Sequence, residues 1–302
     1  MALTGLHFLL TYQCVNECDH CFVWGSPFSS GVWTIASLQK ALDSAETLDS
    51  IDFICFEGGE PFLYYPIMLA GLRDAKNRGF NVGVVSYPYW AQTLEDALEW
   101  LLPLAEIGIS GISVSGDCFH GEKADEAIQQ NAIRAAGELG IPVGLLATAE
   151  DPKAEPPTTV AGKEVGYGNV MYRGRAAVKL APKVPETDKA SWEQFTECPF
   201  ESLMDPGRVH VDPFGNLHIC QGIVIGNLLE RPLADIMAAF DPQANPILKL
   251  LLAGGPTALV KEFDLPLKKS FADACELCYN ARIELRTRFP LILQPDQMYG
   301  QF

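Results

Sequence analysis

Basic residues are scarce in this sequence of 302 residues. It has 22 lysines and arginines against 38 aspartates and glutamates, which gives a formal net charge of −16. A surface this acidic repels phosphate backbones and anionic lipid headgroups. We therefore expect neither nucleic acid nor a membrane surface to be its main binding partner.

Long hydrophobic runs are also lacking. No segment approaches the roughly 18 apolar residues that a bilayer span requires, and the first ten residues carry no basic stretch of the kind that begins a secretory signal. We therefore expect a cytoplasmic protein. Apolar residues nevertheless make up 48% of the chain, enough for a sizeable core. This excludes an intrinsically disordered chain and a small scaffold held by disulfides.

Short apolar runs recur along the first half of the chain, separated by amphipathic stretches typical of helices. This alternation indicates repeated βα units around a parallel sheet. We predict an α/β fold with a partial (β/α)6 barrel of the TIM type, because six units are too few to close the full eight-unit barrel. The strands are expected at 6–11, 51–56, 80–86, 109–115, 141–147 and 169–173, and helices at 34–48, 93–107 and 122–139.

The pattern changes in the second half. Prolines and charges at 151–163 predict an irregular loop, and 181–189 is expected to be a linker. Beyond it we predict a small α+β domain with a β-hairpin and two helices. The hairpin strands are expected at 208–211 and 217–220, the helices at 232–240 and 275–288, and the two domains at 1–190 and 191–302.

Nine cysteines are the most informative residues present. In a reducing compartment, closely spaced cysteines indicate metal binding more often than disulfides. Cys14, Cys18 and Cys21 follow the first predicted strand, and three thiolates so spaced can hold an iron-sulfur cube with one iron left open. The alternative is a zinc site completed by His20 or His7, and spacing alone does not decide between the two.

The three-cysteine loop resembles that of the radical S-adenosylmethionine (radical SAM) enzymes, whose hallmark is Cys-x3-Cys-x2-Cys after strand one of a partial barrel. At the end of the second predicted strand, Gly58, Gly59, Glu60 and Pro61 resemble the Gly-Gly-Glu-Pro motif of this family, which meets the amino group of S-adenosylmethionine. Glycines allow a ligand to approach the backbone closely. The resemblance thus implies a 4Fe-4S cluster and S-adenosylmethionine as cofactors.

Two further motifs extend the resemblance. Ser113, Ser115 and Asp117 share one face of the fourth predicted strand and resemble residues that contact the ribose of the cofactor. Arg173 and Arg175 belong to a segment similar to a Gly-Arg-Ala motif, whose arginine can meet the carboxylate of S-adenosylmethionine. The alternative is that the polar groups bind only water or backbone and that either arginine is a surface charge.

The sequence departs from the family at two positions. Ser86, Tyr87 and Pro88 stand where many relatives carry Thr-Asn-Gly, so a role for an asparagine there is not carried over. Glu57 replaces a small hydroxyl residue before the two glycines. Its carboxylate is expected to shape the cofactor pocket, to touch substrate, or to pair with an arginine inside the barrel.

A second set of cysteines, Cys198, Cys220, Cys275 and Cys278, resembles the ligands of the SPASM and twitch auxiliary-cluster domains of this family. Four cysteines suffice for one closed 4Fe-4S cluster. The additional cysteines of a full SPASM pattern are absent, so we expect a twitch-like domain with one auxiliary cluster. A structural zinc ion bound by four cysteines is the alternative.

Two cysteines remain. Cys55, within the second predicted strand, is expected to be a small buried hydrophobe. Cys118 follows the fourth strand at the end of the barrel where the cofactor is expected. There it is a candidate hydrogen-atom donor to a substrate radical, with an incidental residue as the alternative.

The resemblance implies that S-adenosylmethionine is cleaved reductively to a 5'-deoxyadenosyl radical, which abstracts hydrogen from a substrate C–H bond. We expect net oxidation or cross-linking of a peptide or small metabolite, although no obvious peptide-recognition domain precedes the first strand. The alternative is a non-catalytic iron-sulfur, zinc or electron-transfer protein. An acidic flavodoxin or ferredoxin is the expected reductant, docking at a cationic patch made of Lys261, Lys268, Lys269, Arg282, Arg286 and Arg288.

Overall fold

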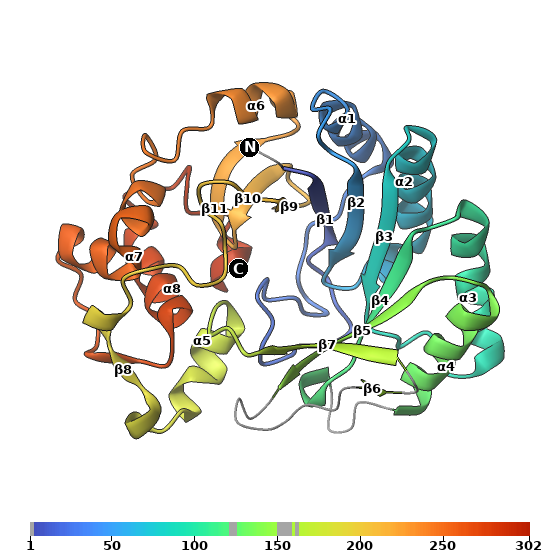
Figure 1. Ribbon diagram of the computed structural model, residues 1–302, viewed down its shortest axis with the longest axis horizontal. Helices are drawn as coiled ribbons and strands as arrows, with labels where there is room; N and C mark the ends of the chain where they lie inside the picture. Colours follow the sequence, from blue (N-terminus) through green and yellow to red (C-terminus); the bar gives the residue numbers. More distant parts are fainter. Residues whose placement is uncertain (1–2, 121–125, 150–158, 161–162) are drawn as a thin grey trace.

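The protein is built around one large, mostly parallel sheet (Figure 1). The computed structural model describes residues 3–120, 126–149, 159–160 and 163–302. Within these ranges the strand order is β11-β10-β9-β1-β2-β3-β4-β5-β7-β6. The strands are β1 (Gly5–Thr11), β2 (Phe53–Gly58), β3 (Asn81–Ser86), β4 (Gly111–Ser115), β5 (Val143–Ala149), β6 (Thr159–Val160), β7 (Lys163–Asn169), β9 (Arg208–Val211), β10 (Asn216–Cys220) and β11 (Ile223–Asn227).

Four helices follow the first four strands and cover the outer face of the sheet (Figure 1). They are α1 (Ile35–Ala45), α2 (Tyr65–Asn77), α3 (Leu94–Ile107) and α4 (Glu126–Glu138). The alternating and parallel arrangement confirms the predicted α/β fold class with its partial barrel. No helix of the described part is long and apolar enough to cross a membrane.

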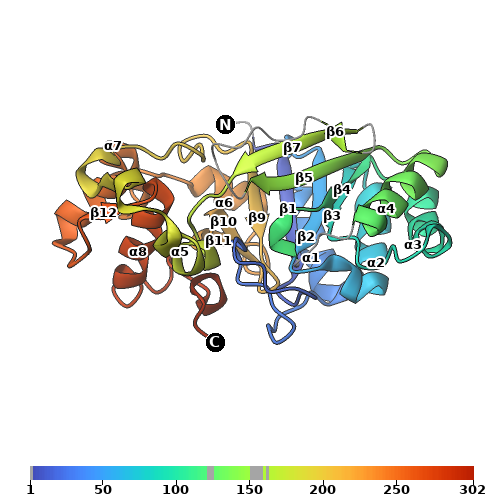
Figure 2. The same ribbon diagram turned by 90° about the horizontal axis from the view of Figure 1, so that it is seen from below.

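The later part of the chain carries α5 (Arg175–Lys179), α6 (Leu233–Ala239), α7 (Leu248–Phe263) and α8 (Ala274–Leu285). A separate two-stranded sheet joins β8 (Ala190–Ser191) and β12 (Ser270–Phe271). In Figure 2, α7, α8 and β12 lie together at the side of the barrel away from α3 and α4. Short 3-10 turns occur at η1 (Pro61–Tyr64), η2 (Cys118–His120), η3 (Ala181–Lys183), η4 (Glu186–Asp188), η5 (Trp192–Gln194) and η6 (Asp296–Tyr299).

The core lies between the sheet and its helices. Leu6, Phe8 and Leu10 alternate along β1 and are buried in the cluster that includes Leu38 and Leu42 of α1. Burying one such side chain contributes about 1.5–3 kcal/mol. The intervening positions of β1 face the inside of the barrel, where the side chains of the site gather.

Helix α3, predicted at 93–107, has a sequence-encoded start and end. Thr93 and Asp96 form a reciprocal cap, each side chain accepting a backbone N–H of the other. Gly108 ends the helix in the left-handed conformation, with φ +72°, which glycine adopts without strain. These local features anchor the turn that carries the chain from α3 into β4.

The sixth parallel strand lies earlier than predicted. It is Lys163–Asn169, not 169–173, and the two-residue β6 falls within the predicted loop 151–163, most of which lies outside the described residues. The segment has few apolar residues, so its strand conformation depends on pairing with β5. Helices α2 and α7 were not predicted. Helix α7 is interrupted by non-helical backbone at Gly254 and Gly255, which hides its periodicity.

The predicted hairpin is confirmed as β9 and β10, which pair antiparallel. Strand β9 also pairs in parallel with β1, so the main sheet continues past residue 190. The predicted linker 181–189 contains two short 3-10 turns and no long helix or strand. The division at 190/191 stays a prediction.

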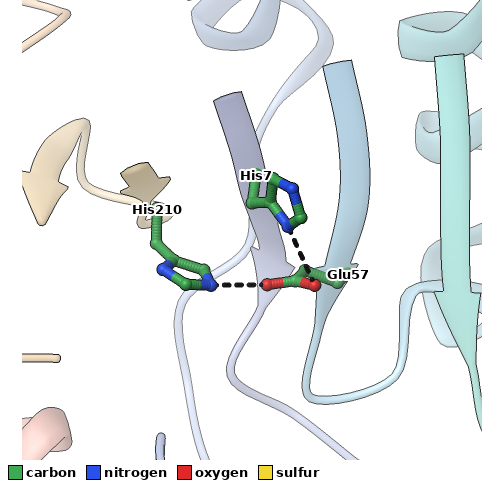
Figure 3. Close-up of side chains that lie close together, drawn as sticks. All are labelled: His7, Glu57 and His210. Atoms are coloured by element: carbon green, nitrogen blue, oxygen red, sulfur yellow. Dashed lines mark hydrogen bonds and ion pairs between the residues drawn. The ribbon is translucent and has the colours of Figure 1, made fainter. Parts of the chain in front are cut away.

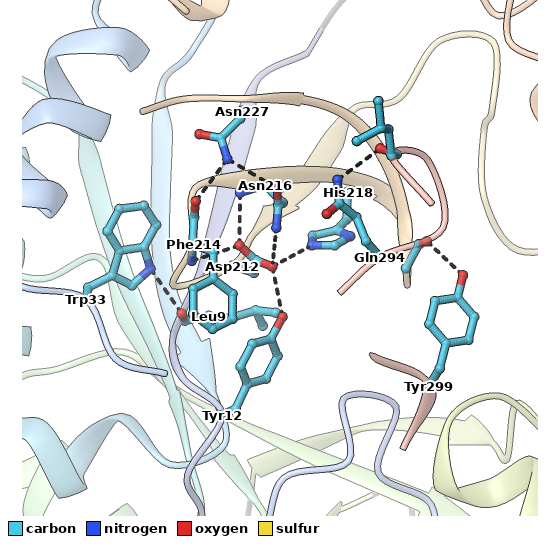
Figure 4. A network of polar contacts seen from close by, with 12 residues as sticks. Leu9, Tyr12, Trp33, Asp212, Phe214, Asn216, His218, Asn227, Gln294 and Tyr299 are labelled. Carbon is cyan, nitrogen blue, oxygen red and sulfur yellow. Dashed lines mark hydrogen bonds and ion pairs between the residues drawn. The ribbon is translucent and has the colours of Figure 1, made fainter. Parts of the chain in front are cut away.

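The turn of this hairpin is organised by a buried carboxylate (Figure 4). Asp212 accepts hydrogen bonds from the backbone N–H groups of Phe214 and Asn216, both at 2.9 Å. It also accepts from the Tyr12 hydroxyl at 3.1 Å and the Asn216 side chain at 3.0 Å, and lies 3.2 Å from His218 Nε2. Burial would raise the pKa of Asp212, but His218 and the hydrogen bonds hold it below its usual value. The network ties the end of β1 to the hairpin.

Replacing Asp212 by alanine is expected to lower the free energy of unfolding by about 3–5 kcal/mol, because it leaves several buried donors unpaired. Chemical denaturation followed by circular dichroism measures the change. The exposed Asp49→Ala variant is the control and should differ from the parent protein by no more than about 0.5 kcal/mol. Equal stability of the Asp212 and Asp49 variants would contradict this role.

Candidate cofactor and metal-cluster sites

The loop after β1 brings three cysteines to one cavity. Cys14, Cys18 and Cys21 line a space of about 550 Å³ at the carboxyl end of the barrel strands. The loop is held by the Cys14 N–H, which donates to Ser26 O at 3.0 Å, and by the Gly25 N–H, which donates to Cys21 Sγ at 3.2 Å.

The chemistry of these thiols fits a bound cationic metal cluster. Burial raises the pKa of Cys14 to about 12 and also raises that of Cys18, and in both cases the neighbouring thiols raise it further. Three thiolates cannot coexist there without a positive partner. His20 lines the same cavity, whereas His7 pairs with Glu57. Of the two histidines considered as a fourth zinc ligand, His20 is therefore the one that lies beside these thiols.

The two glycines of the Gly-Gly-Glu-Pro motif are required by backbone packing as well. Gly58 has φ +132°, and a Cβ on Gly59 would lie 2.0 Å from Gln13 O. The Gly59 N–H donates to Thr11 O at 2.8 Å. Both glycines line the cavity. The end of β2 and the cysteine loop therefore border the same space.

The Glu60 carboxylate is engaged by the protein itself. Its oxygens accept hydrogen bonds from Ser86 Oγ at 2.8 Å and from the backbone N–H groups of Phe62 and Tyr87 at 3.0 and 2.9 Å. Burial raises its pKa to about 7 against these three hydrogen bonds. Glu60 therefore caps η1 and anchors the loop after β3. Its partners Ser86 and Tyr87 border the cavity, whereas Glu60 itself does not.

Of the three residues predicted to contact the ribose at the end of β4, two border the cavity. Ser115 and Asp117 border the cavity, whereas Ser113 is not among its lining residues. Asp117 accepts hydrogen bonds from the Thr148 N–H at 2.9 Å and pairs with His120 Nδ1 at 2.8 Å. Burial would raise the pKa of Asp117, but His120 holds it below its usual value.

The two arginines of the Gly-Arg-Ala segment lie away from the cavity wall. Arg175 is buried and donates to Cys18 O at 2.9 Å and Gly25 O at 2.8 Å. Its own N–H donates to Cys21 O at 2.9 Å. Arg175 therefore holds the cysteine loop. This placement does not support the predicted contact between its guanidinium group and the carboxylate of S-adenosylmethionine.

Arg173 instead lies at the second set of cysteines. Its Nη1 is 3.1 Å from Glu201 Oε1 and 3.8 Å from Cys220 Sγ, and its guanidinium lies 5.4 Å from the ring centre of Phe22. Phe22 directly follows Cys21 in the first loop. Arg173 thus lies between the two cysteine sets.

The second set of cysteines converges as the spacing predicts. Cys198, Cys220, Cys275 and Cys278 line one small cavity, although they come from three separate segments. Burial raises the pKa of Cys278 to about 12, while Arg282 opposes this. Four thiols beside buried guanidinium groups form a donor set that fits one 4Fe-4S cluster.

The predicted cationic docking patch is wrong at Arg282, because this side chain is not on the surface. Arg282 is 1% exposed, with its guanidinium donating to Gln221 O and its Nε to Cys278 O. Arg286 pairs with Asp296, and Lys268 pairs with Glu276 at 2.6 Å. A sequence shows that arginines are close together on a helix, but it does not show which of them face the interior.

Two residues of the cofactor cavity were not predicted. Tyr87 and His120 line it together with His20, and the Tyr87 and His120 rings are stacked with centres 5.2 Å apart. The departure from Thr-Asn-Gly at Tyr87 was the one available signal. The two remaining cysteines do not line this cavity, since Cys55 is buried in β2 and Cys118 is exposed on η2.

Glu57 borders the same cavity and pairs with histidines (Figure 3). His7 Nδ1 and His210 Nε2 approach its two oxygens at 3.3 and 2.9 Å. The expectation that it pairs with a barrel arginine is wrong. The histidines come from β1 and β9, and no local sequence pattern connects them.

The Arg175→Lys variant tests how the first loop is held. A lysine offers no planar fork for two carbonyls, so we expect the loop to lose about 1.5–3 kcal/mol and the first cysteine set to retain less iron after anaerobic reconstitution. Iron per chain measures this. Lys179→Met, an exposed change on the same helix, should retain the parent iron content. Unchanged iron with weaker S-adenosylmethionine binding would instead indicate that Arg175 contacts the cofactor.

No family model matches the chain. A stretch of 111 residues is 22% identical to the putative peptide biosynthesis protein YydG of Bacillus subtilis (strain 168), covering 37% of this chain and 35% of that protein. The match therefore spans about a third of the curated relative.

Matches to solved structures cover most of the chain. The crystal structure of BtrN in complex with AdoMet and 2-DOIA matches with a TM-score of 0.54 at 16% identity, covering 93% of both chains. Streptococcus suis SuiB bound to S-adenosylmethionine matches with a TM-score of 0.45 at 12% identity, covering 86% of this chain and 75% of SuiB. At this identity, the match to BtrN shows that the two chains share a fold.

Proposed function

We propose that this protein is a radical SAM enzyme. The observation that carries the proposal is the convergence of Cys14, Cys18 and Cys21 with Gly58 and Gly59 around one cavity at the carboxyl end of a parallel barrel. Active sites of βα barrels lie at this end of the strands. A cavity of about 550 Å³ is also large enough for a cofactor of this size with a small substrate group.

The three cysteines of the first loop would hold a 4Fe-4S cluster, with S-adenosylmethionine against the two glycines. When bound and reduced by one electron, this pair would supply methionine and a 5'-deoxyadenosyl radical for hydrogen abstraction from a substrate C–H bond. Three cysteine ligands would leave one metal position for the amino and carboxylate groups of S-adenosylmethionine.

The protein's own contribution is positioning and the exclusion of water. Phe22, Val85, Leu146 and Ala147 supply apolar walls of the cavity. Asp117 is held in place by His120 and the Thr148 N–H, so its carboxylate is oriented before any ligand enters. Such preorganisation keeps a ribose hydroxyl or a substrate group in one position beside the reacting atom.

The second set, Cys198, Cys220, Cys275 and Cys278, would hold one auxiliary 4Fe-4S cluster in a twitch-like region, with zinc as the alternative. A closed cluster suits removal of the electron that a net oxidation leaves on the substrate. Arg173 between the two sets supports this assignment, because its charge would stabilise an added electron at the thiolate-bound group. The reductant of the first cluster would be a flavodoxin or ferredoxin.

The substrate class is a peptide or a small metabolite. The match to a peptide biosynthesis protein favours the first, and the fold shared with the complex of BtrN and 2-DOIA favours the second. Incubation with each class under reducing conditions, followed by mass spectrometry for a loss of two hydrogens or a new cross-link, distinguishes them.

Cleavage of S-adenosylmethionine tests the proposed activity. The anaerobically reconstituted protein with dithionite should form 5'-deoxyadenosine, detected by liquid chromatography, and Cys14→Ala should abolish it because the cluster loses a ligand. Cys55→Ala is the matched control, since Cys55 is buried in β2 away from the loop. Absence of 5'-deoxyadenosine from a fully iron-loaded sample would favour a non-catalytic or electron-transfer protein.

Iron counting tests the auxiliary cluster. We expect about eight iron ions per chain, falling to about four in Cys275→Ala, with 5'-deoxyadenosine formation retained. The exposed Cys118→Ala variant should keep all the iron. An unchanged iron content in the Cys275 variant, or zinc in its place, would contradict the second cluster. Full product formation by Cys118→Ala would also exclude Cys118 as the hydrogen donor.

A further inference from the structure

Two histidines and a glutamate on neighbouring strands lie close together (Figure 3), and the glutamate borders the cofactor cavity. His7 of β1 and His210 of β9 are direct partners in the parallel register, and Glu57 projects from the neighbouring strand β2. One ligand atom from each side chain lies within 4.8 Å of the others. The side chains are 12–18% exposed, so the cluster is sheltered but accessible.

The hydrogen bonds of the cluster leave one carboxylate oxygen over. His7 Nδ1 and Glu57 Oε2 form a hydrogen bond at 3.3 Å, whereas Glu57 Oε1, a buried oxygen 2.9 Å from His210 Nε2, has no hydrogen-bond partner among the described residues. A buried carboxylate oxygen without a hydrogen bond lowers the stability of the folded protein. A metal ion bound between the three side chains would give this oxygen a partner.

A second group with the same residue types provides a contrast. His20, Asp117 and His120 also place their ligand atoms within 4.8 Å of one another. There, however, both Asp117 oxygens accept backbone hydrogen bonds, from the Phe119 and Thr148 N–H groups. Its carboxylate is committed to the protein, whereas the contacts of the Glu57 carboxylate are the two histidines.

The Glu57 cluster is also reachable from two sides. Glu57 borders the cofactor cavity, and His7 borders a second cavity of about 470 Å³ at the amino ends of β1 and β9. A metal ion held by three protein ligands here would keep a coordination position for an outside molecule.

We propose that His7, Glu57 and His210 form a binding site for a divalent metal ion, with Zn²⁺ as the ion that best suits two imidazoles and one carboxylate. Such a ligand set leaves the fourth position of a tetrahedral zinc open. An oxygen of the substrate, from a hydroxyl, carbonyl or carboxylate group, would occupy that position at the edge of the cofactor cavity. The site does not depend on the proposed radical chemistry.

The test uses the full chain with its iron-sulfur clusters reconstituted, then one equivalent of Zn²⁺ followed by desalting. Mass spectrometry of metals should show about one zinc ion per chain. X-ray absorption at the zinc edge should show nitrogen and oxygen ligands at about 2.0–2.1 Å without sulfur at about 2.3 Å, which separates this site from the cysteines.

Three variants complete the test: His7→Ala, His210→Ala and Glu57→Gln, the last keeping the shape of the side chain. Each should lose the zinc while keeping its iron content and its circular dichroism spectrum. His120→Ala, from the contrasting group, should retain the zinc. The proposal is overturned if the parent protein binds no zinc, if the zinc has sulfur ligands, or if zinc persists in the folded His7 and His210 variants. Iron content and 5'-deoxyadenosine formation, measured on the same samples, report on the proposed function separately.

Discussion

The backbone contact between the ends of β1 and β2 is the constraint on which the candidate site depends. The Gly59 N–H donates to Thr11 O and the Glu60 N–H donates to Gln13 O, both at 2.8 Å. No side chain fits between these strands at Gly59, since a Cβ there would overlap Gln13 O. The contact places the Gly-Gly-Glu-Pro segment against the cysteine loop, so the cofactor space exists only when both strand ends are in register.

The same loop is held from the opposite side by residues far away in the sequence. Arg175 donates to Cys18 O, and Gln297 donates to the carbonyls of Val23 and Trp24. Trp24 in turn donates to the Tyr279 hydroxyl on α8, the helix that carries Cys278. The two cysteine sets are thereby parts of one packed assembly. These contacts fix the positions of the two cysteine sets relative to each other.

Much of the fold could be predicted because its signals are local. The capping pair at Thr93 and the glycine at the end of α3 act over a few residues, and the apolar alternation of β1 follows from the geometry of a strand. Strand β7 could not be placed, because its conformation comes from pairing with β5 rather than from its own residues. The interior position of Arg282 was likewise hidden, since neighbours from distant segments decide which face of α8 is buried.

By itself, the sequence determined the three-cysteine loop, the Cys275/Cys278 pair and the glycine motif, since spacing within one loop or one helix turn is a property of the local chain. The meeting of Cys198 and Cys220 with that pair depends on the tertiary structure. Tertiary structure alone decided what Arg173 and Arg175 do, and that Glu57 meets two histidines rather than an arginine. His7, Glu57 and His210 lie on three strands that are neighbours in the sheet but far apart along the chain. Strand order and register, set by the packing of the whole barrel, bring such residues together, and no local pattern encodes that meeting.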